Sequence, residues 1–425
     1  MTSEHTDVEV DRRTYVKGAA ALGALGTTTI AGCTDDSGEF EIVHWWTAGG
    51  EEEALDALLE GFLEEYDYDE GVIDNNPAPG GAGTAVDAAI QSRVIDEDPP
   101  STFQIWPGES LRPYTDADVL ASLEDHWDDD QRDAYLDDVV DLASPEGEIV
   151  AVPINIHRMN NIFYNVDVVD DADVDLGDVE DPEAFLDVLE AVDDAGYTGL
   201  AHQTGSEWST LQMWESLFIG QHGVDAYQTF LDRDVEAVES EIEESLELVV
   251  DYREYFSPDA SSIEWDEANN QVINGDAAFL HQGDWAAGQY GTADLEYGED
   301  WDYIAVPGTE DVYHVVMDSF VMPEPNPSPE ITEEFVTYCG SVDAQERFNP
   351  IKGSIPPRTD VPTDEFPPFL QDQMDDFEAS TAQPPTVAHG SGFDPAGKSE
   401  LEEIFSEFIE NWDASETTGR ILSDL

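Results

Sequence analysis

An excess of acidic side chains restricts this chain more than any other feature. The 425 residues include 99 Asp and Glu against 14 Lys and Arg, a formal net charge of -85. Repulsion of this size would destabilise a compact chain at ordinary ionic strength, whereas molar salt shortens the screening length to about 3 Å. Since 40% of the residues are hydrophobic and 10% are aromatic, the chain still has the material for packed cores. We predict a globular, halophilic protein, and we exclude a nucleic-acid partner because it would need a basic surface.

The N-terminal residues have the features of an export signal. Arg12 and Arg13 form a twin-arginine pair, and a weakly apolar run that ends at Ile30 follows them. That run is too short to span a membrane, which takes about 20 apolar residues. Ile30 to Cys33 is typical of a lipobox, where a cysteine becomes the lipidated first residue of a lipoprotein; the alternative is a frayed helix with a chance cysteine. We predict twin-arginine export and a lipid anchor at Cys33 on the outer face of the cell membrane.

Reactive and basic residues are scarce in the rest of the chain. With Cys33 acylated, Cys339 has no cysteine to pair with and is expected to be a small buried side chain. No Cys and His cluster has metal-ligand spacing, and carboxylate spacing is uninformative where nearly a quarter of the residues are acidic. We expect no metal, no cofactor and no catalytic residue. Apart from Lys17 in the signal, the lysines are Lys352 and Lys398.

The start of the exported chain predicts an α/β arrangement. Phe40 to His44 is expected to be a strand, and Ser101 to Trp106 is expected to be another. Two amphipathic helices are predicted between them, the second after a glycine cluster. Their apolar positions are Leu55, Leu58, Leu59, Phe62, Leu63 and Tyr66, then Val86, Ala89, Ile90 and Val94 after Gly80, Gly81 and Gly83.

Two extended runs occur further along the chain. Val150 to Val169 is β-like for almost twenty residues and is either a long hairpin or a strand that crosses from one lobe to another. Val312 to Pro323 is a second such run. Helical spacing is found around Phe185 and again from Leu401 to Trp412.

Nine blocks in a fixed order resemble the extracellular solute-binding proteins of ABC transporters, specifically the sugar-binding class and its glucose/mannose-binding type. The blocks are HWWTAGGEEEAL, GGAGT, DPPSTFQIWPGES, VPINIHRMNNIFYN, EWSTLQMWES, INGDAAFLHQGDWAAGQY, MDSFVMP, RFNPIKGSIPPR and VAHGSG. The resemblance implies a type II fold of two α/β lobes with ligand in the cleft, a hinge motion and a monomer that partners the permease. It places the crossovers near 152–156, 315–318 and 355–358. The implied parts are a signal peptide in 1–32, a linker in 33–39, lobe 1 in 40–152 with 316–355, and lobe 2 in 153–315 with 356–425.

Trp45 and Trp46 end the first predicted strand. Successive side chains of a strand point to opposite faces, so the two rings cannot both comfortably join the core that holds Ile42. A pyranose ring offers a face of C–H groups to an aromatic plane, and its hydroxyls need polar partners at the edge. We predict that one ring packs into its lobe while the other contacts a hexose, glucose or mannose by resemblance; the alternative is that both are core residues.

The resemblance implies further ligand contacts. Glu51 occupies the position of a ligand-contacting glutamate, with Glu52 as its competitor, and Trp106 replaces a histidine of the family. The chain's own composition also favours Lys352 as a ligand contact. A protein so poor in lysine has little reason to keep one in a turn framed by Pro and Gly unless it has a function. His157 and Asp284 are more readily explained as structural residues. The remaining implied contacts are Gln104, Trp208, Trp285, Asp318 and His389.

Other functions are less well supported. Gly392 to Ser399 matches a phosphate-binding loop letter for letter, but no good strand precedes it. A secreted glycoside hydrolase would also combine tryptophans with carboxylates, which must flank the scissile bond at about 5–9.5 Å. A binder of peptides or polyamines on the same scaffold would need acidic cages or backbone-reading grooves in place of Trp with Lys and His.

Overall fold

The computed structural model describes residues 40–47, 50–78, 90–94, 98–127, 129–145 and 147–425. Residues 38–425 form one compact unit. The predicted export signal, lipobox and glycine cluster, and most of the second predicted helix, lie outside the described residues. Within these residues, no helix combines the length and the apolar character that a membrane span requires.

One sheet has the strand order β2-β1-β3-β11-β4. β1 is parallel to β2 and to β3, whereas β11 is antiparallel to β3 and β4. All four residues of β3 are buried, as expected of a central strand that is covered on both faces. The strands are β1 (Phe40–His44), β2 (Ile73–Pro77), β3 (Thr102–Ile105), β4 (Ala151–Pro153) and β11 (Ser319–Val321).

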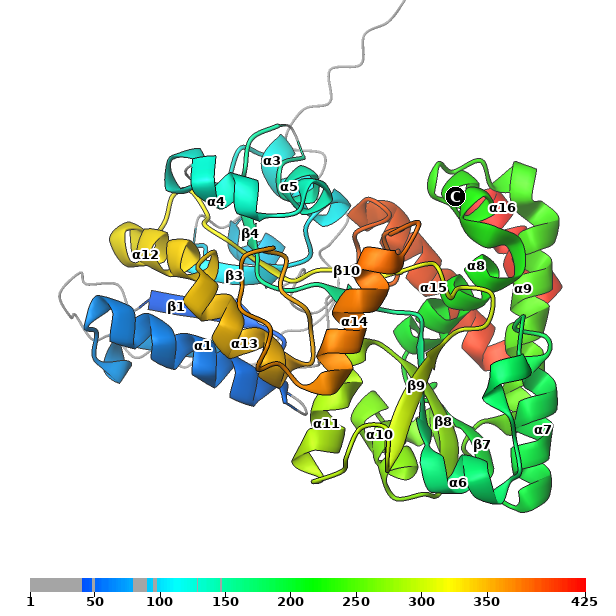
Figure 1. Cartoon of the computed structure of the whole chain (residues 1–425). Coiled ribbons are helices and arrows are strands. Elements are labelled where there is room, and N and C mark those ends of the chain that lie inside the picture. The colour runs from blue at the N-terminus through cyan, green and yellow to red at the C-terminus, as the bar shows by residue number, and fades with distance from the viewer. Residues whose placement is uncertain (1–39, 48–49, 79–89, 95–97, 128, 146) are drawn as a thin grey trace, which may run out of the picture. The chain divides into compact units, whose positions relative to one another are not determined.

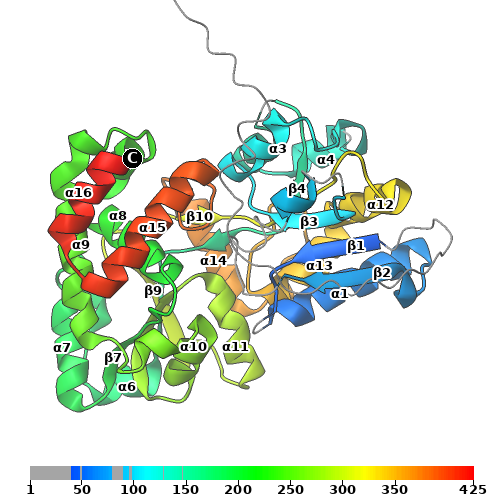
Figure 2. The same ribbon diagram turned by 180° about the vertical axis from the view of Figure 1, so that it is seen from behind.

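Helices cover this sheet and define lobe 1. Leu55, Leu58 and Phe62 form the buried face of α1, so the predicted periodicity is confirmed, and α1 packs beside α13 and α12 (Figures 1 and 2). α5 packs against β4. The helices of lobe 1 are α1 (Glu51–Tyr66), α3 (Arg112–Asp116), α4 (Asp129–Ala134), α5 (Asp137–Ala143), α12 (Pro329–Cys339) and α13 (Val342–Lys352).

The second sheet, β7-β8-β6-β9, is the centre of lobe 2. β7 and β8 are parallel, while β6 is antiparallel to β8 and β9. The strands are β6 (Asn161–Asn165), β7 (Thr198–Ala201), β8 (Ala277–Gln282) and β9 (Trp301–Ala305). The helices are α6 (Val166–Asp171), α7 (Phe185–Ala195), α8 (Trp208–Leu231), α9 (Glu239–Tyr252), α10 (Trp265–Ile273), α11 (Ala287–Thr292), α14 (Pro368–Ala379), α15 (Pro395–Asn411) and α16 (Ala414–Asp424).

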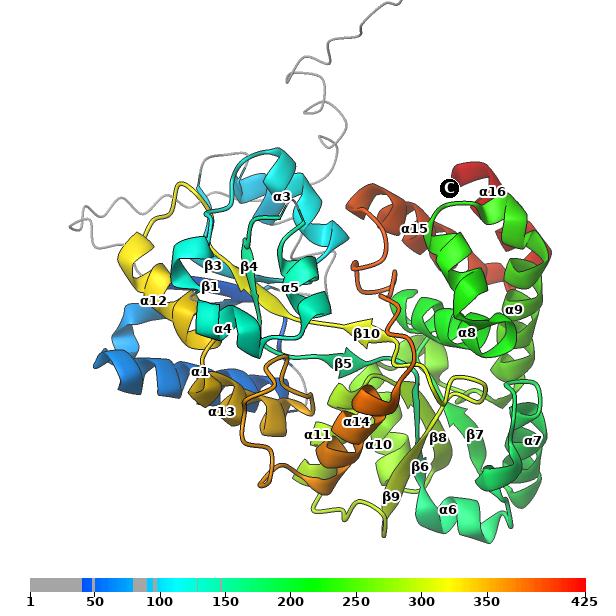
Figure 3. The same ribbon diagram turned by 45° about the horizontal axis from the view of Figure 1, so that its top comes forward.

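Three segments connect the two lobes. The chain passes from β4 to β6, from β9 to β11 and from α13 to α14. On the way, β5 (His157–Arg158) pairs antiparallel with β10 (Val315–Val316), and Figure 3 shows these two strands running between the lobes. Ile156 forms a bridge to Ile355, which brings the third segment beside the first. All three connections therefore meet in one region.

The β-like run 150–169 crosses from lobe 1 to lobe 2, as one of the two predictions had it, but it does so as several short strands and not as one. It forms β4, β5 and β6, which belong to three different sheets, and its end is helical. The side chain of Asn165 accepts a hydrogen bond from the amide of Val168 and caps α6, so the valines that follow are helical despite their β preference.

Candidate functional site

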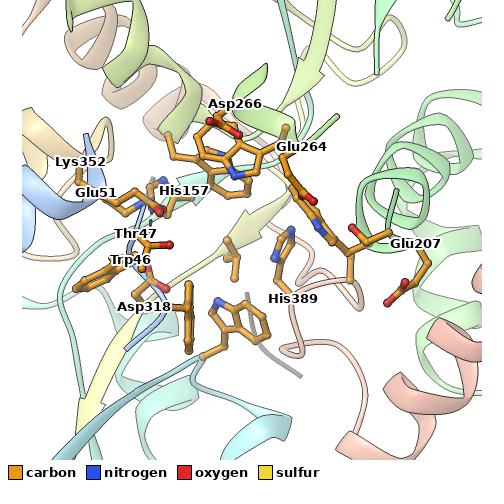
Figure 4. A pocket seen from close by; sticks show the side chains of 18 of the residues that line it. Trp46, Thr47, Glu51, His157, Glu207, Glu264, Asp266, Asp318, Lys352 and His389 are labelled. Carbon is orange, nitrogen blue, oxygen red and sulfur yellow. Dashed lines mark hydrogen bonds and ion pairs between the residues drawn. The ribbon is translucent and has the colours of Figure 1, made fainter. Parts of the chain in front are cut away.

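A cavity of about 520 Å³ opens between the two lobes. Figure 4 shows side chains converging on it from both sides. Nine of the ten predicted ligand residues line it, namely Trp45, Trp46, Glu51, Trp106, Trp208, Trp285, Asp318, Lys352 and His389. The tenth, Gln104, lies behind the wall. The structure therefore brings together residues from distant parts of the chain.

The two tryptophans at the end of β1 have different surroundings. The ring of Trp46 is 1% exposed and packs against Phe320 and Phe348 of lobe 1, with centroid distances of 5.7 and 5.0 Å. Trp45 is 7% exposed, and its ring centroid lies 4.8 Å from that of Trp106. Trp46 thus joins the core of lobe 1, while Trp45 and Trp106 form an aromatic wall of the cavity.

Lys352 is the centre of a buried charged group. Its Nζ lies 3.1 Å from Oε1 of Glu51 and 3.2 Å from Nε2 of His157, and its side chain is 1% exposed. Burial raises the pKa of Glu51, and the ammonium group limits that rise. The competing residue, Glu52, is exposed. α13 ends at Lys352 and is capped by Gly353, whose φ of 79° favours glycine, and the helix end places Lys352 at the cavity.

Asp318 is held by two amides. Its Oδ1 accepts a hydrogen bond from Nε2 of Gln104 and its Oδ2 accepts one from Nδ2 of Asn155, both at 2.8 Å. Burial opposes ionisation, but the neighbouring His157, Lys352 and Asn155 outweigh it and lower the pKa of Asp318 to about 2. Gln104 also accepts from the backbone amide of Trp45 at 3.1 Å, so it orients two cavity residues from behind.

His157 lines the cavity, although the sequence favoured a structural role. Its Nδ1 is hydrogen-bonded to Asp284, and its Nε2 lies 3.0 Å from Nδ2 of Asn155. Asp284 also accepts from the amide of Arg158 at 3.1 Å, which ties β5 to the loop that carries Trp285. His157 therefore connects Lys352 to the crossover strand, and only the fold reveals this position.

His389 is enclosed by three tryptophans. The ring centroids of Trp106, Trp208 and Trp285 lie 5.4, 5.8 and 5.5 Å from that of the imidazole. Nε2 of His389 lies 3.0 Å from Oε1 of Gln212, whose Nε2 donates to the carbonyl of Met159 at 3.2 Å. Since the amide oxygen can only accept, Nε2 carries the proton. The ring therefore keeps Nδ1 as an acceptor.

We expect the imidazole of His389 to remain neutral from pH 8 down to a pH of about 3, because burial, with the nearby Lys398, lowers its pKa to about 3. NMR titration of ¹³C-labelled histidines in molar salt would measure this. The His389→Asn variant assigns the resonance by its loss. A midpoint between pH 5 and 8 would contradict the expectation.

The segment that carries His389 is held by a buried carboxylate. Glu215 of α8 is 0% exposed and accepts hydrogen bonds from the amides of Val387 and Ala388 at 2.6 and 3.2 Å. It also accepts from Thr386 Oγ1 at 2.8 Å and from the hydroxyl of Tyr227. We did not predict Gln212 or Glu215; polar residues within the apolar run LQMWESLFI are the signal that marks them.

Lys398, the other lysine outside the predicted signal, also lines the cavity. Lys398 forms an ion pair with Glu402 one turn further along α15, and its Nζ lies 5.6 Å from the ring centroid of Trp106. Asp394 caps the helix by accepting from the amides of Ala396 and Gly397. A phosphate-binding loop would offer those amides to a nucleotide, but here they donate to Asp394. The residues of Gly392 to Ser399 that match the phosphate-loop pattern thus form a capped helix start. Scarcity of lysine was a usable signal for Lys398.

Beside the predicted Trp208, the lobe 2 wall adds residues that we did not predict. Trp265 is the first residue of α10, as Trp208 is of α8, and a glutamate precedes each of them. These half-buried tryptophans line the cavity together with Ser206, Glu207, Glu264 and Asp266. The repeated Glu-Trp pair at a helix start was visible in the sequence.

Comparisons with known proteins agree with this architecture. The family of bacterial extracellular solute-binding proteins matches residues 69–375. An uncharacterized ABC transporter extracellular-binding protein of Pyrococcus horikoshii is 33% identical, with 97% of this chain and 96% of that protein covered. The xylose/arabinose-binding protein XacG of Haloferax volcanii is 36% identical, with 95% of each covered.

Solved structures resemble the fold despite low identity. A chitin oligosaccharide binding protein superposes with a TM-score of 0.78 at 17% identity, over 91% of this chain and 98% of the other. The likeness confirms the predicted two-lobed α/β fold with a cleft between the lobes.

Proposed function

Because this chain belongs to the bacterial extracellular solute-binding proteins, we propose that it is the sugar receptor of an ABC transporter. It captures a monosaccharide in the cavity between its lobes and delivers it to the permease subunits. The three connecting segments act as the hinge, and the lobes, with the boundaries predicted from the sequence, close on the ligand. The protein works as a monomer.

The combination of ring platforms and polar groups in one cavity carries the sugar assignment. Trp45, Trp106, Trp208 and Trp285 offer aromatic surfaces, and Lys352 is a donor beside the acceptor Asp318. A polyol needs this alternation of C–H contacts and hydrogen bonds of both kinds. Glu51 and His389 complete the contacts, with Nδ1 of His389 accepting from a hydroxyl, and Trp46 supports this wall from the core of lobe 1. Gln104 acts from behind by orienting Asp318.

Glucose and mannose are the sugars that we propose first. They come from the resemblance of the nine sequence blocks, whereas the relative XacG is named for xylose and arabinose. Pentoses therefore belong in any ligand panel. The two lysines that line the cavity, Lys352 and Lys398, form ion pairs with Glu51 and Glu402. Their charges are therefore already neutralised, and the cavity favours an uncharged ligand.

The export features fit the same function. Twin-arginine export through Arg12 and Arg13, cleavage before Cys33 and lipidation of that cysteine would tether the receptor to the outer face of the membrane. The acidic surface suits an extracellular space with molar salt. Residues 1–39 lie outside the described part of the chain, and this anchoring rests on their sequence.

Isothermal titration in molar salt tests the sugar receptor. The panel is glucose, mannose, galactose, xylose, arabinose and a disaccharide, and we expect saturable one-to-one binding of a hexose. An aryl glycoside assay on the same sample is expected to release no chromophore. Release would favour the alternative, a carbohydrate-active enzyme. If folded protein bound none of these sugars, the sugar assignment would be wrong.

A further inference from the structure

The ammonium group of Lys352 has three N–H donors, and two of them meet fixed acceptors. Figure 4 shows Lys352 beside Glu51 and His157 at one edge of the cavity. Oε1 of Glu51 lies 3.1 Å from Nζ, and Nε2 of His157 lies 3.2 Å from the same atom. Among the described residues, no hydrogen-bond acceptor is found for the third donor, although Lys352 lines the cavity. The two fixed contacts therefore decide where the third N–H points.

The contact with His157 requires Nε2 of the imidazole to be an acceptor. Oδ1 of Asn155 accepts from the backbone amide of Asp318 at 2.7 Å, so the other atom of the Asn155 side-chain amide, Nδ2, is the donor. This Nδ2 lies 3.0 Å from Nε2 of His157. Two groups that can only donate, an NH₂ and an ammonium, thus converge on Nε2. The proton of the neutral imidazole must then lie on Nδ1.

Asp284 keeps the imidazole in this form. It is 0% exposed and accepts from Nδ1 of His157 with one carboxylate oxygen. Its other oxygen accepts from the backbone amide of Arg158 at 3.1 Å, which fixes the carboxylate in place. A chain of contacts thus runs from Asp284 in lobe 2, through His157 in the crossover, to Lys352 in lobe 1.

We propose that His157 and Asp284 are positioning residues, which aim the third N–H of Lys352 at one hydroxyl of the bound sugar. This inference rests on the proposed function as a sugar receptor. A lysine held by Glu51 alone could swing about its flexible stem and donate to any hydroxyl within reach. Two contacts in different directions fix both Nζ and the remaining donor. Discrimination between sugars at that hydroxyl therefore depends on His157, which acts through Lys352.

Protonation of His157 would remove the acceptor. Burial and Lys352 oppose protonation, but Asp284 and Asp318 outweigh them and raise the pKa of His157. Above that pKa the ring is neutral, and Nε2 accepts from the ammonium group. Below it, Nε2 carries a proton and meets the ammonium group as a second donor of like charge. Sugar affinity should therefore fall as the pH drops through the pKa of His157. The charged groups around the ring are Asp284, Asp318, Glu51 and Lys352.

Two variants of His157 each keep half of the contacts of its ring. The side-chain amide of asparagine ends near the place of Nδ1, so His157→Asn keeps a donor for Asp284 and loses the acceptor for Lys352. Glutamine reaches the place of Nε2, so His157→Gln keeps that acceptor. His202→Asn is the matched control. His202 is another buried histidine of lobe 2, it is hydrogen-bonded to Thr210 at 3.1 Å, and it does not line the cavity.

Isothermal titration in molar salt at about pH 9 compares the tightest-binding sugar of the panel with analogues that each lack one hydroxyl. The hydroxyl that Lys352 meets is the one whose loss costs about tenfold or more in the unchanged protein and little in Lys352→Met. We expect His157→Asn to reduce this penalty to about threefold or less, although the lysine is still present. His157→Gln should retain most of the penalty, and His202→Asn should retain all of it.

The pH profile is a second measurement that a merely structural role would not move. Between about pH 9 and about pH 6, we expect the sugar affinity of the unchanged protein to fall about threefold or more. His157→Gln has no imidazole at this position, so its affinity should stay constant over the same range. An equal fall in both proteins would contradict the proposal.

NMR of ¹⁵N-labelled histidines measures the proton position in the unchanged protein, without any sugar. At about pH 9 we expect a proton on Nδ1 of His157 and none on Nε2, with the resonances assigned by their loss in either His157 variant. A proton on Nε2 at that pH would overturn the proposal. If His157→Asn weakened the sugar and all its analogues by the same factor, the positioning role would be wrong and the sugar receptor would stand. If the folded protein bound no sugar of the panel, the proposed function would fail and the positioning role with it.

Discussion

Replacing Glu215 with leucine is expected to lower the free energy of unfolding by about 3–5 kcal/mol, because each buried hydrogen-bond donor left unsatisfied costs about 1–3 kcal/mol. The carboxylate accepts from two backbone amides and from the hydroxyls of Thr386 and Tyr227. In the variant, the two amides and the Thr386 hydroxyl would be left without a partner inside the protein, whereas Tyr227 would keep the carbonyl of Pro385 at 3.2 Å. Urea unfolding at constant molar salt, followed by circular dichroism, measures the loss.

Two further variants sharpen this test. Glu215→Gln keeps one oxygen but turns an NH₂ group toward donors, so it should also be destabilised. Glu247→Gln makes the same carboxyl-to-amide change at an exposed position of α9 and should change stability by less than about 0.5 kcal/mol. Stability of Glu215→Leu close to that of Glu247→Gln would show that the hydrogen bonds to segment 386–388 do not hold it. Because His389 follows that segment directly, sugar affinity should fall together with stability.

Replacing Lys352 with methionine is expected to weaken sugar binding about tenfold or more, which corresponds to at least about 1.4 kcal/mol. The ammonium group is a cavity donor, and it also neutralises Glu51 at 3.1 Å. Without it, burial would raise the pKa of Glu51 further. Isothermal titration with the sugar that the panel identifies measures the loss.

Arg347→Met is the matched control for this change. Arg347 lies on the same helix, α13, and pairs with Asp343 and Glu64 away from the cavity, so the same loss of charge should leave affinity unchanged. The double variant Glu51→Gln with Lys352→Met removes the buried carboxylate as well. We expect this double variant to have a higher melting temperature than Lys352→Met, because no unpaired carboxylate is left buried, and to bind sugar no better than Lys352→Met. Equal affinities for Lys352→Met and Arg347→Met would exclude Lys352 from the site.

Local sequence patterns predicted a helix well where its apolar residues form one buried face. The stripe Leu55, Leu58 and Phe62 specifies α1, because helix periodicity depends only on neighbours along the chain. The run 150–169 was harder, because β preference does not say which strand will be the partner. β4, β5 and β6 each pair with segments more than a hundred residues away. Asn165 then converts the end of the run into a helix.

Prediction of the site had the same limit. Composition made Lys352 stand out, and the resemblance gathered nine residues that the structure places around one cavity. His157, Gln212 and Glu215 were missed because their roles depend on partners that the sequence does not show. Nε2 of His157 meets Lys352 across 195 positions of sequence, and Glu215 reaches Val387 across 172.

The sequence by itself determined the acidic composition, from its residue counts, and the helix at α1, from its periodicity, while the resemblance of nine ordered blocks implied the family and the two-lobed α/β fold. Only the tertiary structure decided that Trp46 packs into lobe 1 while Trp45 lies beside Trp106, and that Glu51 rather than Glu52 meets Lys352. It also decided the protonated nitrogen of His389, through Gln212. The reason is physical: hydrogen bonds, ion pairs and ring contacts act over a few ångströms, and the distance between residues far apart in sequence is set by how the whole chain packs.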